Sequence, residues 1–313
     1  MIDFNEIKGI SAEVINNVEK VIIGKAFEIR LTLLAVFSGG HILFEDVPGV
    51  GKTMLARAIS SSLGCSFKRI QFTPDLLPSD ITGVSIYNQN INKFEFRPGP
   101  VISNIVLADE INRATPKTQS SLLECMEEKQ VTVDGITHRL TEPFLVIATQ
   151  NSIEYEGTFP LPRAQLDRFA IKIRLGYPGQ KAEEELLLKQ QKKHPILDLE
   201  KVITPDKLLE VQEKVKDVYV SENIRKYIVS IVQKTRENLR FTLGASPRGS
   251  ISLFKISQVY AAIEGRDYVI PDDIKKIVIP CLAHRIIPKY EFENKSMENI
   301  FFELLDEIEV PVV

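Results

Sequence analysis

The sequence predicts an α/β protein in which a parallel sheet is followed by a second domain built from helices. Five short runs, most of them apolar, are typical of strands, and helical patterns separate them: residues 42–44, 67–72, 104–109, 144–149 and 170–175. Strands that alternate with helices favour a parallel sheet with right-handed crossovers. After Gly176-Tyr-Pro-Gly179 only helical patterns follow. We therefore expect one domain over residues 1–177 and another over residues 178–313.

Length and composition are those of a soluble globular protein. The 313 residues suit two domains of roughly 100–200 residues each. The net charge of −3 argues against a strongly basic chain that binds nucleic acid. Three widely spaced cysteines suggest core thiols in a reducing compartment. No secretory signal is recognisable, and no apolar run approaches the ~18 residues of a membrane span. We expect a cytoplasmic protein without membrane insertion.

Two helices are expected before the first strand. Residues 3–20 place apolar side chains at helical spacing, and Val21 to Gly24 interrupt that pattern. An apolar helix is then expected from Phe27 to Phe37, ending at a pair of glycines.

The first strand leads into a phosphate-binding pattern. Ile42 to Phe44 are followed by a turn with two glycines and then by Lys52 and Thr53, where a helical pattern begins. A strand, a glycine turn and a helix of this kind cradle a nucleoside triphosphate with backbone N–H groups, while the lysine neutralises charge and the threonine hydroxyl ligates Mg²⁺. Asp46 stands where a full phosphate loop has glycine. Aspartate tolerates left-handed backbone better than most residues, so the prediction is kept.

Two hairpins are predicted within the first domain. Residues 74–100 hold two β-like runs, Val84–Tyr87 and Lys93–Phe96, where a crossover helix would be expected. Residues 131–140 form a second hairpin signal around an Asp-Gly turn. A helix from Thr118 to Glu127 separates the two.

Polar residues follow the next two buried strands. Asp109 and Glu110 end one, and Asn151 comes just after the other. Ligands bind at the carboxyl ends of parallel strands, so these side chains should lie beside Thr53. Asp109 would then complete the Mg²⁺ site, Glu110 would polarise an attacking water, and Asn151 would orient it.

The second domain is expected to hold about six helices. One covers Glu183–Lys193, and others begin near Thr204, Ser221, Ser246, Pro271 and Met297. Arg248 lies in the first turn of its helix, where a cation opposes the helix dipole. That arrangement favours an anion near Arg248.

The motifs in this order resemble the MoxR family of AAA+ ATPases, from about residue 21 to about residue 285. The resemblance rests on Gly-Val-Gly-Lys-Thr, Leu-Ala-Asp-Glu-Ile-Asn-Arg-Ala, Ala-Thr-Gln-Asn, Leu-Pro-x-Ala-Gln-Leu-Asp-Arg-Phe and Gly-Ala-Ser-Pro-Arg. It implies a P-loop AAA+ core with a five-stranded parallel sheet and an all-α lid. It also implies a homo-oligomeric ring, usually hexameric, with ATP and Mg²⁺ bound between neighbours. The two hairpins resemble the helix-2 insert and the presensor-1 hairpin of the helix-2-insert clade, which face the pore.

The resemblance assigns roles residue by residue. Asn151 matches the first sensor and Arg248 the second, which reaches from the lid to the γ-phosphate. Arg168 matches the arginine finger, with Arg163 as an alternative and Arg113 as a further interface candidate. The expected nucleotide contacts, starting with the segment that packs on adenine, are Ile23, Gly24, Val47, Pro48, Gly49, Val50, Gly51, Lys52, Thr53, Met54, Asp109 and Arg248, with Thr53 and Asp109 as metal ligands.

Two kinds of client are compatible with such an ATPase. The family implies a chaperone-like remodeller that matures proteins, assembles complexes or inserts metals or cofactors, with a von Willebrand A domain protein as partner. The alternative is a nucleic-acid translocase. The predicted hairpin regions carry charges of −1 (residues 75–100) and zero (residues 129–142), whereas a pore that grips phosphates should be basic. Nucleic acid is therefore the less favoured client. A scaffold that binds nucleotide without hydrolysis is disfavoured because Glu110 is present.

Overall fold

A five-stranded parallel sheet forms the centre of the first domain. In this computed structural model the described residues are 2–90, 92–151, 157–190, 195–289 and 297–311. The strand order is β2-β5-β8-β1-β9 and all neighbours are parallel. The strands are β1 (His41–Glu45), β2 (Phe67–Gln71), β5 (Ile105–Asp109), β8 (Leu145–Gln150) and β9 (Phe169–Ile173). The prediction of an α/β fold with a five-stranded parallel sheet is confirmed.

Helices cover both faces of this sheet because alternate strand residues point to opposite sides. On one face the strand residues pack with α1 (Phe4–Glu19), α2 (Ala26–Phe37) and α3 (Lys52–Ser62). On the other face Leu43, Val106 and Val146 pack with α5 (Pro116–Glu128). The short helices η1 (Ile111–Arg113) and α6 (Arg163–Leu166) follow β5 and precede β9. The sheet is thus buried on both faces, as its near-continuous apolar strands require.

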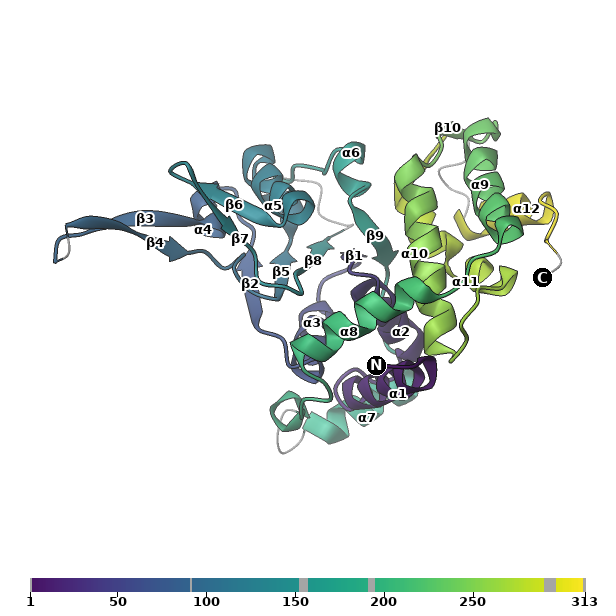
Figure 1. Cartoon of the computed structure of the whole chain (residues 1–313), viewed down its shortest axis with the longest axis horizontal. Coiled ribbons are helices and arrows are strands. Elements are labelled where there is room, and N and C mark those ends of the chain that lie inside the picture. The colour runs from purple at the N-terminus through teal and green to yellow at the C-terminus, as the bar shows by residue number, and fades with distance from the viewer. Residues whose placement is uncertain (1, 91, 152–156, 191–194, 290–296, 312–313) are drawn as a thin grey trace.

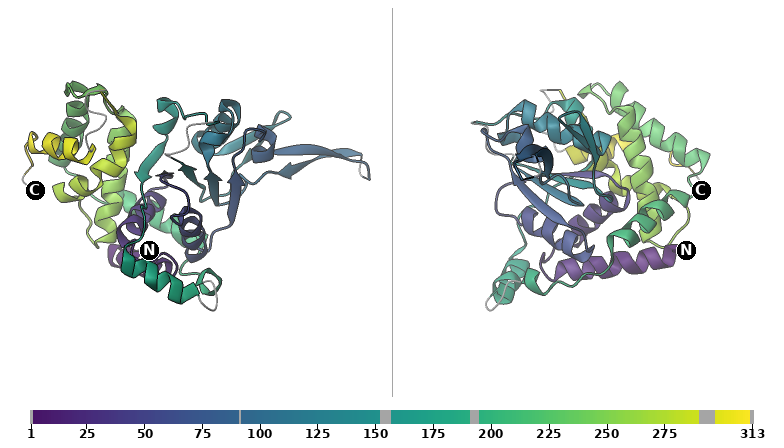
Figure 2. Two further views of the ribbon diagram at one scale, coloured as in Figure 1. Left: turned by 180° about the vertical axis from the view of Figure 1, so that it is seen from behind. Right: turned by 60° about the vertical axis from the view of Figure 1, so that its left-hand side comes forward.

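Both predicted hairpins are present. The first consists of β3 (Gly83–Asn88) and β4 (Lys93–Pro98), preceded by α4 (Pro78–Thr82), and the second of β6 (Gln130–Val133) and β7 (Ile136–Arg139). The β3–β4 hairpin extends beyond the sheet, on the side away from the lid helices (Figure 1, and Figure 2, left). Its Phe96 ring stacks on His138 of the second hairpin, with centroids 3.9 Å apart. The two hairpins therefore touch at their bases.

The rest of the chain is mainly helical, as predicted. It contains α7 (Gln180–Gln190), η2 (Pro195–Asp198), α8 (Pro205–Lys214), η3 (Val215–Asp217), α9 (Glu222–Glu237), α10 (Pro247–Ile263), α11 (Pro271–Leu282), η4 (Ala283–Arg285) and α12 (Met297–Asp306). A short antiparallel pair, β10 (Phe241–Leu243) with β11 (Ile287–Pro288), was not predicted. In the part of the chain that the structure describes, no helix is both long and apolar enough to cross a membrane.

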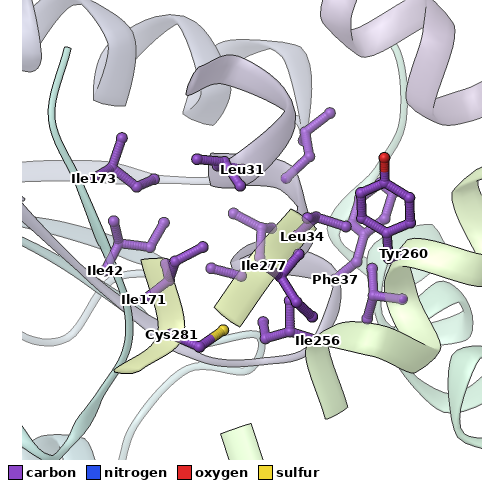
Figure 3. Packing of buried hydrophobic residues seen from close by; sticks show 14 of the residues in the cluster. Leu31, Leu34, Phe37, Ile42, Ile171, Ile173, Ile256, Tyr260, Ile277 and Cys281 are labelled. Atoms are coloured by element: carbon purple, nitrogen blue, oxygen red, sulfur yellow. The ribbon is translucent and has the colours of Figure 1, made fainter. Parts of the chain in front are cut away.

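One hydrophobic cluster joins the lid helices to the sheet. Leu34 and Phe37 of α2 and Ile171 of β9 pack with Ile256 of α10 and Cys281 of α11 (Figure 3). The last strand of the sheet ends at Ile173 and α7 begins at Gln180. The boundary at residue 177 stays a prediction, since this core continues across it.

Candidate active site

The phosphate loop connects β1 to α3 and has the backbone that its glycines allow. Gly49 and Gly51 have φ angles of 84° and 97°, in the left-handed region that favours glycine. Gly51 is the N-cap residue of α3, and among the described residues no side chain caps the first N–H groups of that helix. Uncapped N–H groups at a helix N-terminus, together with the helix dipole, attract an anion.

The Lys52 side chain folds back across this loop. Its Nζ donates hydrogen bonds to the carbonyl oxygens of Asp46 (2.8 Å) and Val47 (3.1 Å). Burial lowers the pKa of Lys52, while the charges of Asp46, Asp109 and Glu110 oppose that shift. The Lys52 ammonium is thus held over the loop and lines the cavity next to it.

Asp46 is accommodated for a reason other than the one expected. Its φ is not among the positive values, so the left-handed backbone that aspartate tolerates is not used. Instead, the buried carboxylate accepts two backbone hydrogen bonds, from the N–H of Val47 (2.8 Å) and from the N–H of Gly176 (2.5 Å). The Asp46 side chain thus joins two segments of the chain.

Asp109 ends β5 beside the first turn of α3. Its Oδ2 lies 3.5 Å from the Thr53 hydroxyl, and its Oδ1 accepts a hydrogen bond of 2.6 Å from the Thr149 hydroxyl. Arg69 of β2 also pairs with Oδ2, at 2.7 Å. Hydroxyl and carboxylate oxygens are the ligands that Mg²⁺ prefers, so this donor set fits the metal that the sequence implied.

Glu110 has a strained backbone, with φ 56° and ψ 49°, although it is not glycine. Its N–H donates to the Thr149 hydroxyl at 2.8 Å. Its carboxylate accepts a hydrogen bond from Gln71 (2.8 Å) and forms an ion pair with Arg113 (3.1 Å). Strain of this kind persists where surrounding contacts fix it, and it is common at functional sites. Here the contacts hold Glu110 in the cavity that Thr53 and Asp109 also line.

Two adjoining cavities contain most of the predicted site. One, of about 290 Å³, is lined by Pro48, Gly49, Gly51, Lys52, Thr53, Met54, Asp109, Glu110, Thr149 and Asn151. The other, of about 230 Å³, is lined by Val21, Ile22, Ile23, Lys25, Val50 and α7 residues, and shares Gly49, Gly51 and Met54 with the first. The phosphate cavity thus continues into a second, largely apolar cavity, which suits a flat base. Gly24 and Val47 line neither cavity.

Arg168 and Arg248, called the arginine pair below, lie elsewhere. Both bind the same carboxylate: Arg168 contacts Glu127 at 2.7 Å and Arg248 contacts it at 2.5 Å. The charge of Arg168, and then that of Arg248, lowers the pKa of Glu127. The two arginines come from different segments, the start of β9 and the start of α10. One acidic residue at the end of α5 therefore brings them together.

The arginine pair sits at the opposite edge of the sheet from the phosphate loop. It lines a cavity of about 280 Å³ together with Glu127 and His41. His41 is the first residue of β1, and the phosphate loop follows the last. Five residues of strand span roughly 16 Å. Within one chain, Arg248 thus lies away from the phosphate cavity, because α10 begins at the amino edge of the sheet.

Four contacts of the site were not predicted. Arg69 and Gln71 alternate on β2 and bind the carboxylates of Asp109 and Glu110. Thr149 is a polar residue at the end of a buried strand. Glu127 ends a helix whose apolar face was predicted. Thr149 could have been suspected, since a buried hydroxyl needs a partner. The others depend on which strands and helices become neighbours.

Comparisons with known proteins give the family of this chain. Residues 41–171 match the model of the ATPase family associated with various cellular activities (AAA), and residues 233–303 match the AAA lid domain. Chaperone MoxR1 of Mycobacterium tuberculosis is 38% identical over 98% of this chain and 85% of its own length. The chain belongs to the MoxR family of AAA+ ATPases.

Two further proteins are similar over nearly their whole length. The protein YeaC of Bacillus subtilis strain 168 is 54% identical over 95% of this chain and 94% of its own. The crystal structure of a candidate ATPase from Cytophaga hutchinsonii has a TM-score of 0.91 and 41% identity, and covers 99% of this chain and 97% of that one. The predicted family and the P-loop AAA+ fold with a lid are confirmed.

Proposed function

We propose that this MoxR-family chain hydrolyses ATP with Mg²⁺ and uses the energy as a chaperone-like remodeller of proteins. The observation that carries the proposal is that one cavity at the carboxyl edge of the sheet contains the side chains needed from this chain. It collects a lysine, a hydroxyl, two carboxylates and an amide: Lys52, Thr53, Asp109, Glu110 and Asn151. These groups suit phosphoryl transfer, because enzymes catalyse that reaction mainly by positioning the reactants and by stabilising the charge that develops on the phosphate.

Each residue has a defined part in the proposed reaction. The loop N–H groups and Lys52 bind the β- and γ-phosphates. Thr53 and Asp109 would hold Mg²⁺, which supplies charge neutralisation for the phosphates. Glu110 accepts the proton of the attacking water, and the Asn151 amide orients that water against the γ-phosphate. Thr149 links the two acidic residues, since its hydroxyl donates to the Asp109 carboxylate and accepts from the backbone N–H of Glu110.

The position of the arginine pair favours a site completed by a neighbouring chain. The phosphate loop lies at the carboxyl edge of the sheet, and the arginine pair lies at the amino edge. They can therefore meet only when the carboxyl edge of one chain faces the amino edge of the next. Head-to-tail contacts of this kind form a ring when the rotation between neighbours closes. We infer a homo-oligomeric ring, hexameric as in the family resemblance, in which Arg168 acts as the finger and Arg248 as the second sensor on a neighbour's nucleotide.

A protein client is proposed on the basis of the hairpins. Phe94 is 73% exposed and Ile136 is 62% exposed, one on each hairpin. Their regions carry little net charge, which suits apolar segments of a protein better than a phosphate backbone. A von Willebrand A domain partner and a role in assembly or in metal or cofactor insertion complete the proposal.

Two variants test the hydrolysis. Lys52→Ala should lose ATP binding and turnover, whereas Glu110→Gln should bind ATP and turn over about 100-fold or more slowly, since it loses the base. Glu128→Gln, at an exposed site on α5, is the matched control for Glu110→Gln. Native turnover in Glu110→Gln would contradict the proposed role. The Glu110→Gln protein also serves as a trap, and the proteins that remain bound to it with ATP identify the client.

A further inference from the structure

The residues before the phosphate loop hold the linker between the sheet and α7. Glu45 binds Lys172 (2.8 Å) and Arg174 (2.9 Å), and the Asp46 carboxylate accepts from the N–H of Gly176. Two successive acidic residues thus bind the end of β9 and the residues that follow it. The next backbone positions of that linker lead directly to α7.

A second grip comes from the segment that lines the apolar cavity. Lys25 Nζ donates hydrogen bonds to the carbonyl oxygens of Leu175 and Tyr177, the latter at 3.0 Å. The linker is therefore bound on both sides of Gly176, by Asp46 on its N–H and by Lys25 on the flanking carbonyls. Gly176 itself has φ 62°, a backbone that suits glycine.

The linker matters for the cavity because α7, the helix it leads into, forms one of the cavity walls. Pro178, Leu186 and Lys189 line the same apolar cavity as Ile23 and Val50. If the linker moves, α7 moves with it, and this wall of the cavity opens. Asp46 is the buried residue that joins the phosphate loop to that wall by way of Gly176.

We propose that Asp46 is a positioning residue that couples the phosphate loop to α7. Its carboxylate holds Val47 and Gly176 together, so that the phosphate loop keeps α7 against the cavity. A nucleotide that reorders the loop passes that change to the linker through the same carboxylate. This inference rests on the proposed ATP binding. It also explains why this chain has aspartate where an ordinary phosphate loop has glycine.

The test restores the ordinary residue. Asp46→Gly gives a complete phosphate-loop pattern, yet we expect its Kd for ATP to rise about tenfold, because a small displacement of a binding wall is costly. Asp46→Asn keeps the size but has a single acceptor oxygen for two N–H donors, and its Kd should rise as well. Asp134→Gly is the matched control, since Asp134 has φ 50° in a hairpin turn where glycine fits.

A second readout needs no nucleotide. Hydrogen exchange at the Gly176 amide should be slow in the native chain and in Asp134→Gly, and at least tenfold faster in both Asp46 variants. Faster exchange with weaker ATP binding supports the coupling. Either Asp46 variant with native ATP affinity, or with native exchange at Gly176, overturns it. If the native chain binds no ATP, the proposed function fails, whereas the exchange experiment still tests the contact between Asp46 and the linker.

Discussion

His41 makes the stability of this protein depend on pH in a defined window. The ring is buried at the start of β1, where its Nδ1 accepts from the N–H of Val146 (3.0 Å) and its Nε2 faces the carbonyl of Met126 (3.2 Å). Only the neutral ring with its proton on Nε2 satisfies both contacts. Burial, aided by the charge of Lys129, lowers the pKa of His41 from 6.5 to about 4.

The sign and size of the effect can be worked out from this shift. Between pH 6.5 and 4 the unfolded chain binds a proton at His41 and the folded chain does not, so acid favours unfolding. The full shift corresponds to roughly 3 kcal/mol, of which about 2 kcal/mol is lost between pH 7 and pH 5. Burial also lowers the pKa of His284, which adds to the loss in the same direction.

Urea unfolding of the native chain and of His41→Asn, each at pH 7 and at pH 5, measures the contribution of His41 to the free energy of unfolding. The asparagine oxygen can still accept from Val146 but does not titrate, so the variant should be less stable at pH 7 and lose about 2 kcal/mol less on acidification than the native chain. His138→Asn, on a hairpin, is the matched control. Equal losses in the native chain and in His41→Asn would refute this account of the buried ring.

Three further predictions concern other parts of the molecule. Glu127→Gln removes the charge that holds the arginine pair, and the ATPase kcat of the assembled protein should fall about tenfold. Native kcat would contradict that role. Gly99→Ala places a methyl group against backbone at the end of α4 and should lower the free energy of unfolding by about 1–3 kcal/mol. Gly9→Ala, in open space on α1, should raise the free energy of unfolding by about 0.5–1 kcal/mol. A urea titration measures both changes. Burial raises the pKa of the thiols of Cys125 and Cys281 to about 12, so a disulfide reagent at pH 8 should modify them only after unfolding, and fast reaction in the native chain would be inconsistent with their burial.

The sheet and its loop were predictable because their signals are local. The strands β1, β5 and β8 are apolar runs that end in a polar residue, and the glycine turn before Lys52 needs a backbone that only glycine readily adopts. The Asp-Gly pair at residues 134–135 likewise determines a turn within four residues. Such patterns predict an element without reference to the rest of the chain.

Contacts between distant segments were not predictable in the same way. Asp46 and Gly176 are 130 positions apart, and the left-handed backbone invoked for Asp46 does not exist. The arginine pair was assigned to a phosphate on motif grounds, but its location depends on where α10 packs. Glu127 gave no signal because an acidic residue at a helix end is ordinary. In each case the partner is chosen by tertiary packing.

In the proposed ring the active site is shared between neighbouring chains. Mixing two inactive variants is the most direct test of this sharing. Lys52→Ala lacks the phosphate-loop lysine but keeps Arg168, and Arg168→Ala has the reverse defect. Mixed at equal amounts, about a quarter of head-to-tail interfaces would pair an intact loop with an intact arginine, so activity should return to roughly that fraction of the native rate. No recovery at any ratio would contradict the shared site.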